Sequence, residues 1–148
     1  MVITVIFKSG SKKFFKSFKE LFTSNKLNEI ATLDCSCNKI QVIPPEIQFL
    51  TNLQKFYCGS NRIRVIPPEI QFLTNLREFY CWGNQIQVIP PEIPGLTSLR
   101  EFDCSDNQIR VIPSEMSRLT NLQKFDCNRN QITQIPFEIT YCRRLRYF

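Results

Sequence analysis

The chain has 148 residues, of which 43% are hydrophobic and 22% are charged, and these proportions indicate neither a disordered chain nor a membrane protein. It contains no histidine, which excludes imidazole bases and zinc sites with imidazole ligands. The net charge of +6 is uneven, because residues 1–26 hold six lysines and one glutamate and the other 122 residues hold 13 basic and 12 acidic groups. A basic segment on a nearly neutral body does not favour nucleic-acid binding.

The first 26 residues differ in pattern from the rest of the chain. Residues 2–7 are a β-prone run that ends at 9–11 (Ser-Gly-Ser), and residues 12–22 follow a helical period with Ser11 as the expected N-cap and Asn25 as the expected stop. One face of this predicted helix carries Phe14, Phe18, Leu21 and Phe22, with Phe15 at its edge. Residues 1–26 are therefore predicted to be a capping strand and amphipathic helix, and residues 27–148 a separate region of repeats.

Lysines opposite the phenylalanines of residues 12–22 leave a second interpretation open. A basic amphipathic helix can lie on an anionic membrane surface. A mitochondrial presequence fits less well, because the stretch has no arginine and contains Glu20.

One 23-residue unit, L-x-x-F-x-C-x-x-N-x-I-x-x-I-P-x-E-I-x-x-L-x-x, recurs through the rest of the chain. Its asparagines show the spacing: Asn38, Asn61, Asn84, Asn107 and Asn130. Residues 42–56 and 65–79 differ at only two of fifteen positions, which indicates recent duplication. A fixed period of this length is typical of a solenoid built from stacked coils.

The unit resembles that of leucine-rich repeat proteins, L-x-x-L-x-L-x-x-N/C-x-L, with Phe for the second Leu and Cys for the third. Its length and the I-P-x-E-I-x-x-L segment resemble the intracellular, Ras-group type, and the Phe-x-Cys variant also resembles repeat arrays of giant amoeba-infecting viruses. The resemblance implies an α/β leucine-rich repeat solenoid with a parallel concave sheet and short helical or 3-10 convex turns. It also implies a cytoplasmic location, in the host cytoplasm if the protein is viral.

The residue types fit this architecture on physical grounds. Alternating Leu, Phe and Cys predict a short strand with one face inward, and the buried Asn amide can bond the backbone of its own and the neighbouring coil. Ile-Pro opens a turn whose helical start favours a nearby Glu. These glutamates are interpreted as caps and not as a binding site: Glu46, Glu69, Glu92, Glu115 and Glu138.

Six of the seven cysteines are predicted to be structural thiols in a reducing compartment. Five recur with the repeat, at Cys35, Cys58, Cys81, Cys104 and Cys127, and Cys142 occupies a leucine column. Free Cys packs as a small hydrophobe, and a straight ladder of thiolates does not converge on one metal ion. Cys37 is left unexplained on the predicted exposed strand face.

The exposed strand columns give two candidate binding neighbourhoods on the concave face. The first is the aromatic patch, Tyr57, Tyr80 and Trp82; the second is the acidic zone, Glu78, Glu101, Asp103, Asp106 and Asp126. Exposed Trp and Tyr are typical of binding hot spots, although cross-strand packing alone also accounts for stacked tyrosines. An acidic neighbourhood favours a partner with basic residues near an apolar anchor.

The sequence predicts no catalytic residues, no metal site and no cofactor. It has no glycine-rich phosphate loop and no nucleophile elbow, and its neighbouring acids arise from repetition on an open surface. The favoured function is a protein–protein interaction module with an unknown protein partner and no nucleic acid. The alternatives are a membrane-surface adaptor that uses the basic N-terminal helix, and a structural module that forms a homodimer through the C-terminal edge at 145–148.

Overall fold

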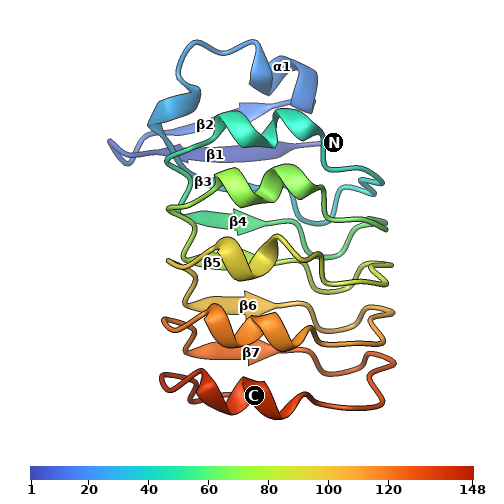
Figure 1. Cartoon of the computed structure of the whole chain (residues 1–148). Coiled ribbons are helices and arrows are strands. Elements are labelled where there is room, and N and C mark those ends of the chain that lie inside the picture. The colour runs from blue at the N-terminus through green and yellow to red at the C-terminus, as the bar shows by residue number, and fades with distance from the viewer.

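The computed structural model describes residues 1–148, and their strands form one seven-stranded sheet in the order β2-β1-β3-β4-β5-β6-β7 (Figure 1). Its parallel part contains β3 (Ile30–Asp34), β4 (Lys55–Tyr57), β5 (Glu78–Tyr80), β6 (Glu101–Asp103) and β7 (Lys124–Asp126). Each residue in a repeat strand pairs with its equivalent 23 positions later, as Phe56 does with Phe79. The predicted solenoid and its parallel sheet are confirmed.

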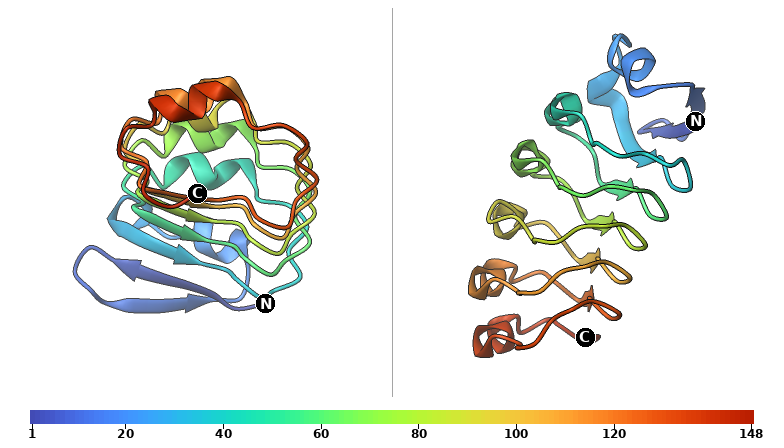
Figure 2. Two further views of the ribbon diagram at one scale, coloured as in Figure 1. Left: turned by 90° about the horizontal axis from the view of Figure 1, so that it is seen from below. Right: turned by 90° about the vertical axis from the view of Figure 1, so that its right-hand side faces the viewer.

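Short 3-10 helices cover the opposite side of the coils from the sheet (Figure 2). They are η1 (Leu27–Glu29), η2 (Pro45–Phe49), η3 (Pro68–Phe72), η4 (Ile93–Gly95), η5 (Ser114–Arg118) and η6 (Phe137–Tyr141). In η2 and η3 the second proline of each Pro-Pro pair begins the helix, where a missing N–H costs nothing. The repeat glutamates lie in the first turn of η2, η3, η5 and η6, and Glu92 is the N-cap residue of η4.

A single hydrophobic core runs through all the coils. The repeat phenylalanines stack along its axis, with ring centroids 5.3 Å apart for Phe56 and Phe79 and 5.5 Å apart for Phe79 and Phe102. Aromatic pairs at such distances stabilise the core beyond the area they bury. The neighbouring coils thus share one core, so no coil is an independent folding unit.

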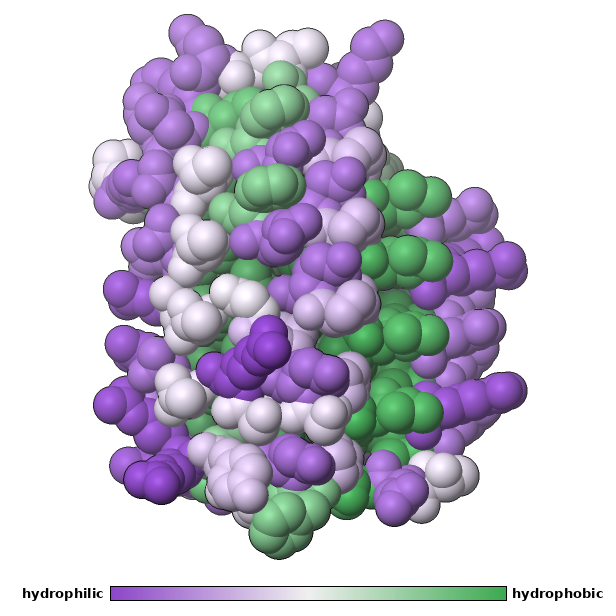
Figure 3. All heavy atoms as spheres, in the orientation of Figure 1, coloured by the Kyte–Doolittle hydropathy of each residue, from purple (hydrophilic) through white to green (hydrophobic).

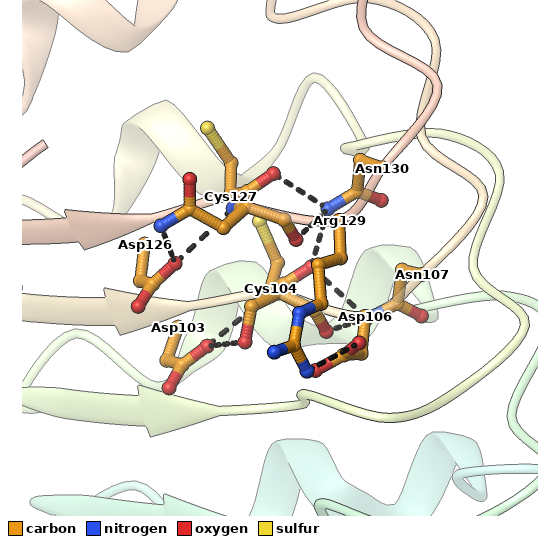
Figure 4. Close-up of polar contacts among 10 residues, drawn as sticks. Asp103, Cys104, Asp106, Asn107, Asp126, Cys127, Arg129 and Asn130 are labelled. Carbon is orange, nitrogen blue, oxygen red and sulfur yellow. Dashed lines mark hydrogen bonds and ion pairs between the residues drawn. The ribbon is translucent and has the colours of Figure 1, made fainter.

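The repeat asparagines join adjacent coils through their side-chain amides. The Asn84 Oδ1 atom accepts the Ile63 N–H at 2.9 Å, while its Nδ2 group donates to the carbonyls of Cys58 and Cys81 at 3.1 and 2.9 Å. Figure 4 shows the equivalent bonds of Asn107 and Asn130. One amide therefore satisfies backbone groups from two coils, as the sequence analysis predicted.

The helix predicted over residues 12–22 is wrong for most of its length. Residues 12–15 instead form β2 (Lys12–Phe15), which is antiparallel to β1 (Ile3–Phe7), and only α1 (Phe18–Phe22) is helical. Phe15 is buried in the core and Phe14 is exposed, which is the alternation of a strand and the reverse of the predicted face. The phenylalanines have a helical spacing by chance, because Phe14 belongs to β2 and Phe18 and Phe22 belong to α1, with Lys16 and Ser17 between the two elements.

The hairpin and helix pack on the first coil. Strand β1 pairs antiparallel with β3, and its side chains Ile3 and Val5 are buried in the common core together with Leu21 of α1. The α1 N-cap is Ser17, whose hydroxyl accepts the Glu20 N–H at 3.1 Å, and not Ser11 as expected. The stabilising role of this segment as a cap stays a prediction.

The last residues begin another strand beside β7. Tyr147 forms an isolated parallel bridge with Lys124, and the Phe148 ring lies 5.5 Å from that of Phe125. Phe148 remains about half exposed. The homodimer expected at this edge stays a prediction.

No helix in the structure combines the length and hydropathy that crossing a membrane requires.

Candidate functional site

The three aromatic side chains predicted to bind a partner lie together on the sheet surface. Tyr57 in β4 and Tyr80 in β5 face outward because the alternating Phe56 and Phe79 face the core. Their rings stack with centroids 5.0 Å apart and an interplanar angle of 30°. Trp82 follows β5 and its side chain is 39% exposed, so a partner can reach it although most of its surface packs against the protein.

Trp82 packs directly over Gly59 of the preceding coil. A Cβ atom built on Gly59 would lie 2.5 Å from Nε1 of Trp82 and 2.6 Å from its Cε2 atom, both inside van der Waals contact. The indole thus occupies the space that any other residue would fill at position 59. Glycine at position 59 therefore leaves the space in which the Trp82 ring lies.

Both tyrosine hydroxyls donate hydrogen bonds to glutamates of the next coil, Tyr57 to Glu78 and Tyr80 to Glu101. Glu78 also forms an ion pair with Lys55, at 2.8 Å between Oε1 and Nζ. Burial, together with these hydrogen bonds, raises the pKa of each tyrosine well above its ordinary value of 10.0, so both hydroxyls remain donors. The two rings are therefore fixed at both ends, by stacking and by a charged acceptor.

These bonds give Glu78 and Glu101 a different role from the one predicted from the sequence. From the sequence, Glu78 and Glu101 were predicted to belong to the acidic zone and to face a partner. In the structure their carboxylates are bound to the tyrosines and position the aromatic patch. The signal was present in the sequence, because each glutamate stands 21 residues after its tyrosine and hence beside it on the adjacent strand.

The aspartates of the acidic zone are also held by local hydrogen bonds (Figure 4). The Asp103 carboxylate accepts the N–H of Ser105 at 3.0 Å and its hydroxyl at 2.6 Å, and Asp126 accepts the Asn128 N–H at 3.1 Å. The two aspartates are paired in register on β6 and β7. Each keeps a partly exposed carboxylate, so this part of the surface presents negative charge in fixed positions.

Asp106 lies on the turn after the strand and not on the strand surface with Asp103 and Asp126. Its backbone is left-handed, with φ of 51°, and its Oδ1 atom lies 3.5 Å from Nη1 of Arg129. The same turn position is left-handed in every coil, at Cys37, Ser60, Gly83, Asp106 and Arg129. Gly83 therefore adopts the backbone conformation that this turn requires. The exposed Cys37 lies on the equivalent turn and not on the strand face where it was predicted.

All seven cysteines are free thiols. Burial raises the pKa of Cys58 and Cys81 well above their ordinary value of 9.0, and burial raises the pKa of the half-buried Cys127 to about 11. These thiols stay protonated at neutral pH and have little nucleophilic character. No group of three or more Cys, Asp or Glu side chains in the structure could hold a metal ion.

Changing Gly59 to Ala is expected to displace the Trp82 indole without unfolding the protein. The added Cβ atom would overlap the ring, which can move because it is partly exposed. Trp82 is the only tryptophan, so its fluorescence emission maximum reports this change, and we expect it to move to longer wavelength. Gly95→Ala is the matched control, because no atom lies within 4 Å of its added Cβ. Identical emission from both variants would disprove the packing of Trp82 on Gly59.

Known structures share this architecture. A leucine-rich repeat protein from Leptospira interrogans superposes with a TM-score of 0.80 at 28% identity, covering 83% of this chain and 31% of its own. Internalin C2 from Listeria monocytogenes has a TM-score of 0.74 at 30% identity, with 82% and 51% covered. A plant peptide hormone receptor, RGFR1 in complex with RGF2, has a TM-score of 0.67 at 32% identity, with 71% and 18% covered. The chain thus spans about half of internalin C2 and less than a third of the other two proteins.

The curated protein sequences contain no match to this chain. A family model described as leucine-rich repeats in two copies matches residues 51–91, 74–114 and 97–139, which together make up more than half of the sequence. Proteins with this fold are generally non-enzymatic interaction modules. The chain belongs to the leucine-rich repeat family.

Proposed function

We propose that the protein binds a protein partner through its concave sheet, with the aromatic patch of Tyr57, Tyr80 and Trp82 as the central contact. The observation that carries this proposal is that the patch is fixed before any partner arrives. Stacking, two tyrosine–glutamate bonds and the glycine beneath Trp82 all restrain it. Rigid aromatic side chains lose little conformational entropy on binding, which favours affinity.

The charge around the patch supports a partner that carries basic residues beside an apolar anchor. Asp103 is paired in register with Tyr80, and Asp126 lies beside it on the next strand, so both hold carboxylates in fixed positions next to the tyrosine stack. Lys124 on β7 and Arg129 on the turn after it carry the opposite charge. Complementary charges would steer association and set the orientation of the partner. A related observation is that the plant peptide hormone receptor with a similar fold was solved in complex with RGF2.

Selection of a displayed random-peptide library on the immobilised protein tests this proposal. We expect the recovered peptides to combine arginine or lysine with an aromatic or aliphatic anchor. Their affinity should fall about tenfold or more, roughly 1.4 kcal/mol, for the variant Tyr80→Ala with Trp82→Ala. Phe72→Ala is the matched control, because Phe72 is an equally large, 49% exposed aromatic on the opposite side. Peptides that bind both variants equally would refute the concave site.

The membrane-surface alternative loses its structural basis. It requires a free amphipathic helix over residues 12–22, but residues 12–15 belong to a sheet and Leu21 of the short helix α1 is buried. The phenylalanines Phe18 and Phe22 pack partly against the core instead of facing outward together. An intracellular location is proposed on a separate ground, since seven free cysteines suit a reducing compartment.

A further inference from the structure

The segments that follow the 3-10 helices form an edge of the solenoid outside the site described above. Four coils carry Thr-Asn or Thr-Ser at the surface of this edge, at residues 51–52, 74–75, 97–98 and 120–121. After η6 the equivalent positions are Arg143 and Arg144. In Figure 3, which shares the orientation of Figure 1, this edge lies on the left and is mainly hydrophilic. Since both arginine side chains are exposed, core packing does not account for this departure from the repeat.

Both arginines line a hollow between two coils of this edge. The hollow has a volume of about 360 Å³, and its lining consists of Thr120, Asn121, Tyr141, Arg143 and Arg144. Arg144 is held in position, because its Nη1 atom donates to Oδ1 of Asn121 at 2.8 Å, and Nδ2 of Asn121 donates to the Thr97 carbonyl at 2.9 Å. One guanidinium group is therefore fixed on the wall of the hollow before any ligand arrives.

The free polar groups of this hollow are hydrogen-bond donors. No hydrogen bond or ion pair in the structure involves the Arg143 guanidinium group or the hydroxyls of Thr120 and Tyr141. The side-chain carbonyl of Asn121 already accepts from Arg144. The hollow thus offers a guanidinium group and two hydroxyls to a ligand, and no carboxylate lines it.

The helix side of the hollow has acidic residues, but they lie away from it. Arg118 ends η5 in the position that Tyr141 holds in η6. Glu115 and Glu138 stand in the first turns of these helices, three residues earlier, which is about 6 Å along a 3-10 helix, and neither lines the hollow. The carbonyls that end both helices, those of Arg118 and Tyr141, already accept backbone N–H groups at 2.8 Å. The arginines that line the hollow are therefore nearer to a bound ligand than the two glutamates.

The sheet side of the hollow adds further charges of both signs. Its basic residues are Arg100, Lys124 and Arg146. Glu101 is adjacent to Arg100, but its carboxylate accepts the hydroxyl of Tyr80. The strand aspartates Asp103 and Asp126 lie two positions farther along β6 and β7. With Arg143 and Arg144 included, positive charge predominates around the hollow.

A phosphate monoester matches this arrangement. It carries a charge of about −1.5 to −2 at pH 7 and has three acceptor oxygens, so it balances two guanidinium groups and also accepts from neighbouring hydroxyls. A phosphodiester of a nucleic acid carries one charge per phosphate and balances only one arginine. Tyr141 adds an apolar surface, since its side chain is 55% exposed and its ring stands edge-on to that of Phe137, with centroids 5.9 Å apart. The carbon atoms of a phosphorylated side chain can pack on this ring.

From these observations we propose that the hollow binds a phosphorylated side chain of a partner protein. Arg143 and Arg144 pair with the phosphate group, and the hydroxyls of Thr120 and Tyr141 donate to its remaining oxygen atoms. The site lies on the edge of the solenoid and uses no residue of the concave surface, so it goes beyond the function proposed above.

Titration of the isotope-labelled protein with a short phosphotyrosine peptide, whose other residues are uncharged, tests the proposal by nuclear magnetic resonance. We expect the amides of Thr120, Asn121, Arg143 and Arg144 to shift, and the unphosphorylated peptide to leave them in place. The variant Arg143→Ala with Arg144→Ala should bind about tenfold or more weakly. Both side chains are exposed, so the variant should keep its fold, which circular dichroism verifies.

Arg64→Ala with Arg110→Ala is the matched control. It removes the same charge and two arginines that are likewise exposed, and each of these bonds a glutamine of the next coil at 3.2 Å. This variant should bind the phosphotyrosine peptide as tightly as the wild type does, because its arginines lie on the loops between the strands and the 3-10 helices and not at the hollow.

The pH dependence of binding gives a second readout. The chain has no histidine, so no side chain with an ordinary pKa titrates between about pH 5.5 and 7.5. The phosphate group loses its second proton near pH 6, so the affinity of the phosphotyrosine peptide should rise across this range. A tyrosine-sulfate peptide keeps one charge throughout and should bind more weakly, with no such rise.

Three results would overturn the proposal. The first is equal binding of the phosphorylated and unphosphorylated peptides. The second is equal affinity of the two arginine variants for the phosphotyrosine peptide. The third is that phosphatidic acid vesicles bind the wild type but not the variant of Arg143 and Arg144 while the phosphotyrosine peptide binds neither, since a lipid headgroup would then be the ligand.

Discussion

Raising the pH from 8 to 10 is expected to remove about 5 kcal/mol from the free energy of unfolding. Burial raises the pKa of Cys35, Cys58, Cys81 and Cys104 far above the ordinary value of 9.0, so the folded protein keeps these protons. The unfolded chain releases them as the pH passes 9. The unfolded state then binds fewer protons than the folded state, so stability falls with increasing pH from about 9 upward, by about 1.4 kcal/mol per thiol and pH unit.

Urea unfolding at a series of pH values from 7 to 10 measures this loss, followed by circular dichroism. A loss of this size approaches the whole stability of an ordinary domain. The control is Cys58→Ala with Cys81→Ala, which removes two of the four fully buried thiols and should roughly halve the dependence on pH. The same pH dependence in this variant, or constant stability up to pH 10, would show that the buried thiols do not cause it.

Replacing Asn84 by Ala is expected to cost about 2–3 kcal/mol of stability. The side chain is buried, and its removal leaves the Ile63 N–H without its acceptor. The carbonyls of Cys58 and Cys81 each lose one of two amide donors and keep the other, from Asn61 and Asn107. A buried backbone group without a partner costs about 1–3 kcal/mol. The loss should spread to both adjacent coils, because the amide joins them.

Asn75→Ala, at the last position of the preceding unit, provides the comparison. Asn75 also donates from its Nδ2 group to a backbone carbonyl, that of Thr51 at 2.9 Å, but it is exposed and water can replace it. We expect this variant to lose less than about 1 kcal/mol in urea unfolding. Similar losses from the two variants would contradict the assignment of Asn84 as the link between coils.

Repetition made most of the fold predictable from the sequence. The 23-residue spacing identifies the strand, the core columns and the coil-joining asparagines together, because every coil must satisfy the same packing requirement. The non-repeated segment was predicted incorrectly, and within the repeats Cys37 and Asp106 were placed on the strand face although they lie on the turn after it. In the non-repeated segment Phe14, Phe18, Leu21 and Phe22 mimic a helical period, while the actual pairing of β2 with β1 is a non-local contact that periodicity does not reveal.

The candidate site was only partly predictable, for two physical reasons. Tyr57, Tyr80 and Trp82 follow from strand alternation, but their restraint by Glu78, Glu101 and Gly59 depends on contacts between coils. The turn at Asp106 could not be recognised, because four of its five equivalents are not glycine although all are left-handed.

The most direct test of the concave site follows the Trp82 indole N–H by nuclear magnetic resonance during titration with a peptide selected on the protein. Trp82 is the only tryptophan, so its indole signal is assigned without ambiguity. Binding at the aromatic patch should shift this resonance together with the amides of Tyr57 and Tyr80. An indole signal that stays in place while resonances elsewhere move would show that the partner binds another surface.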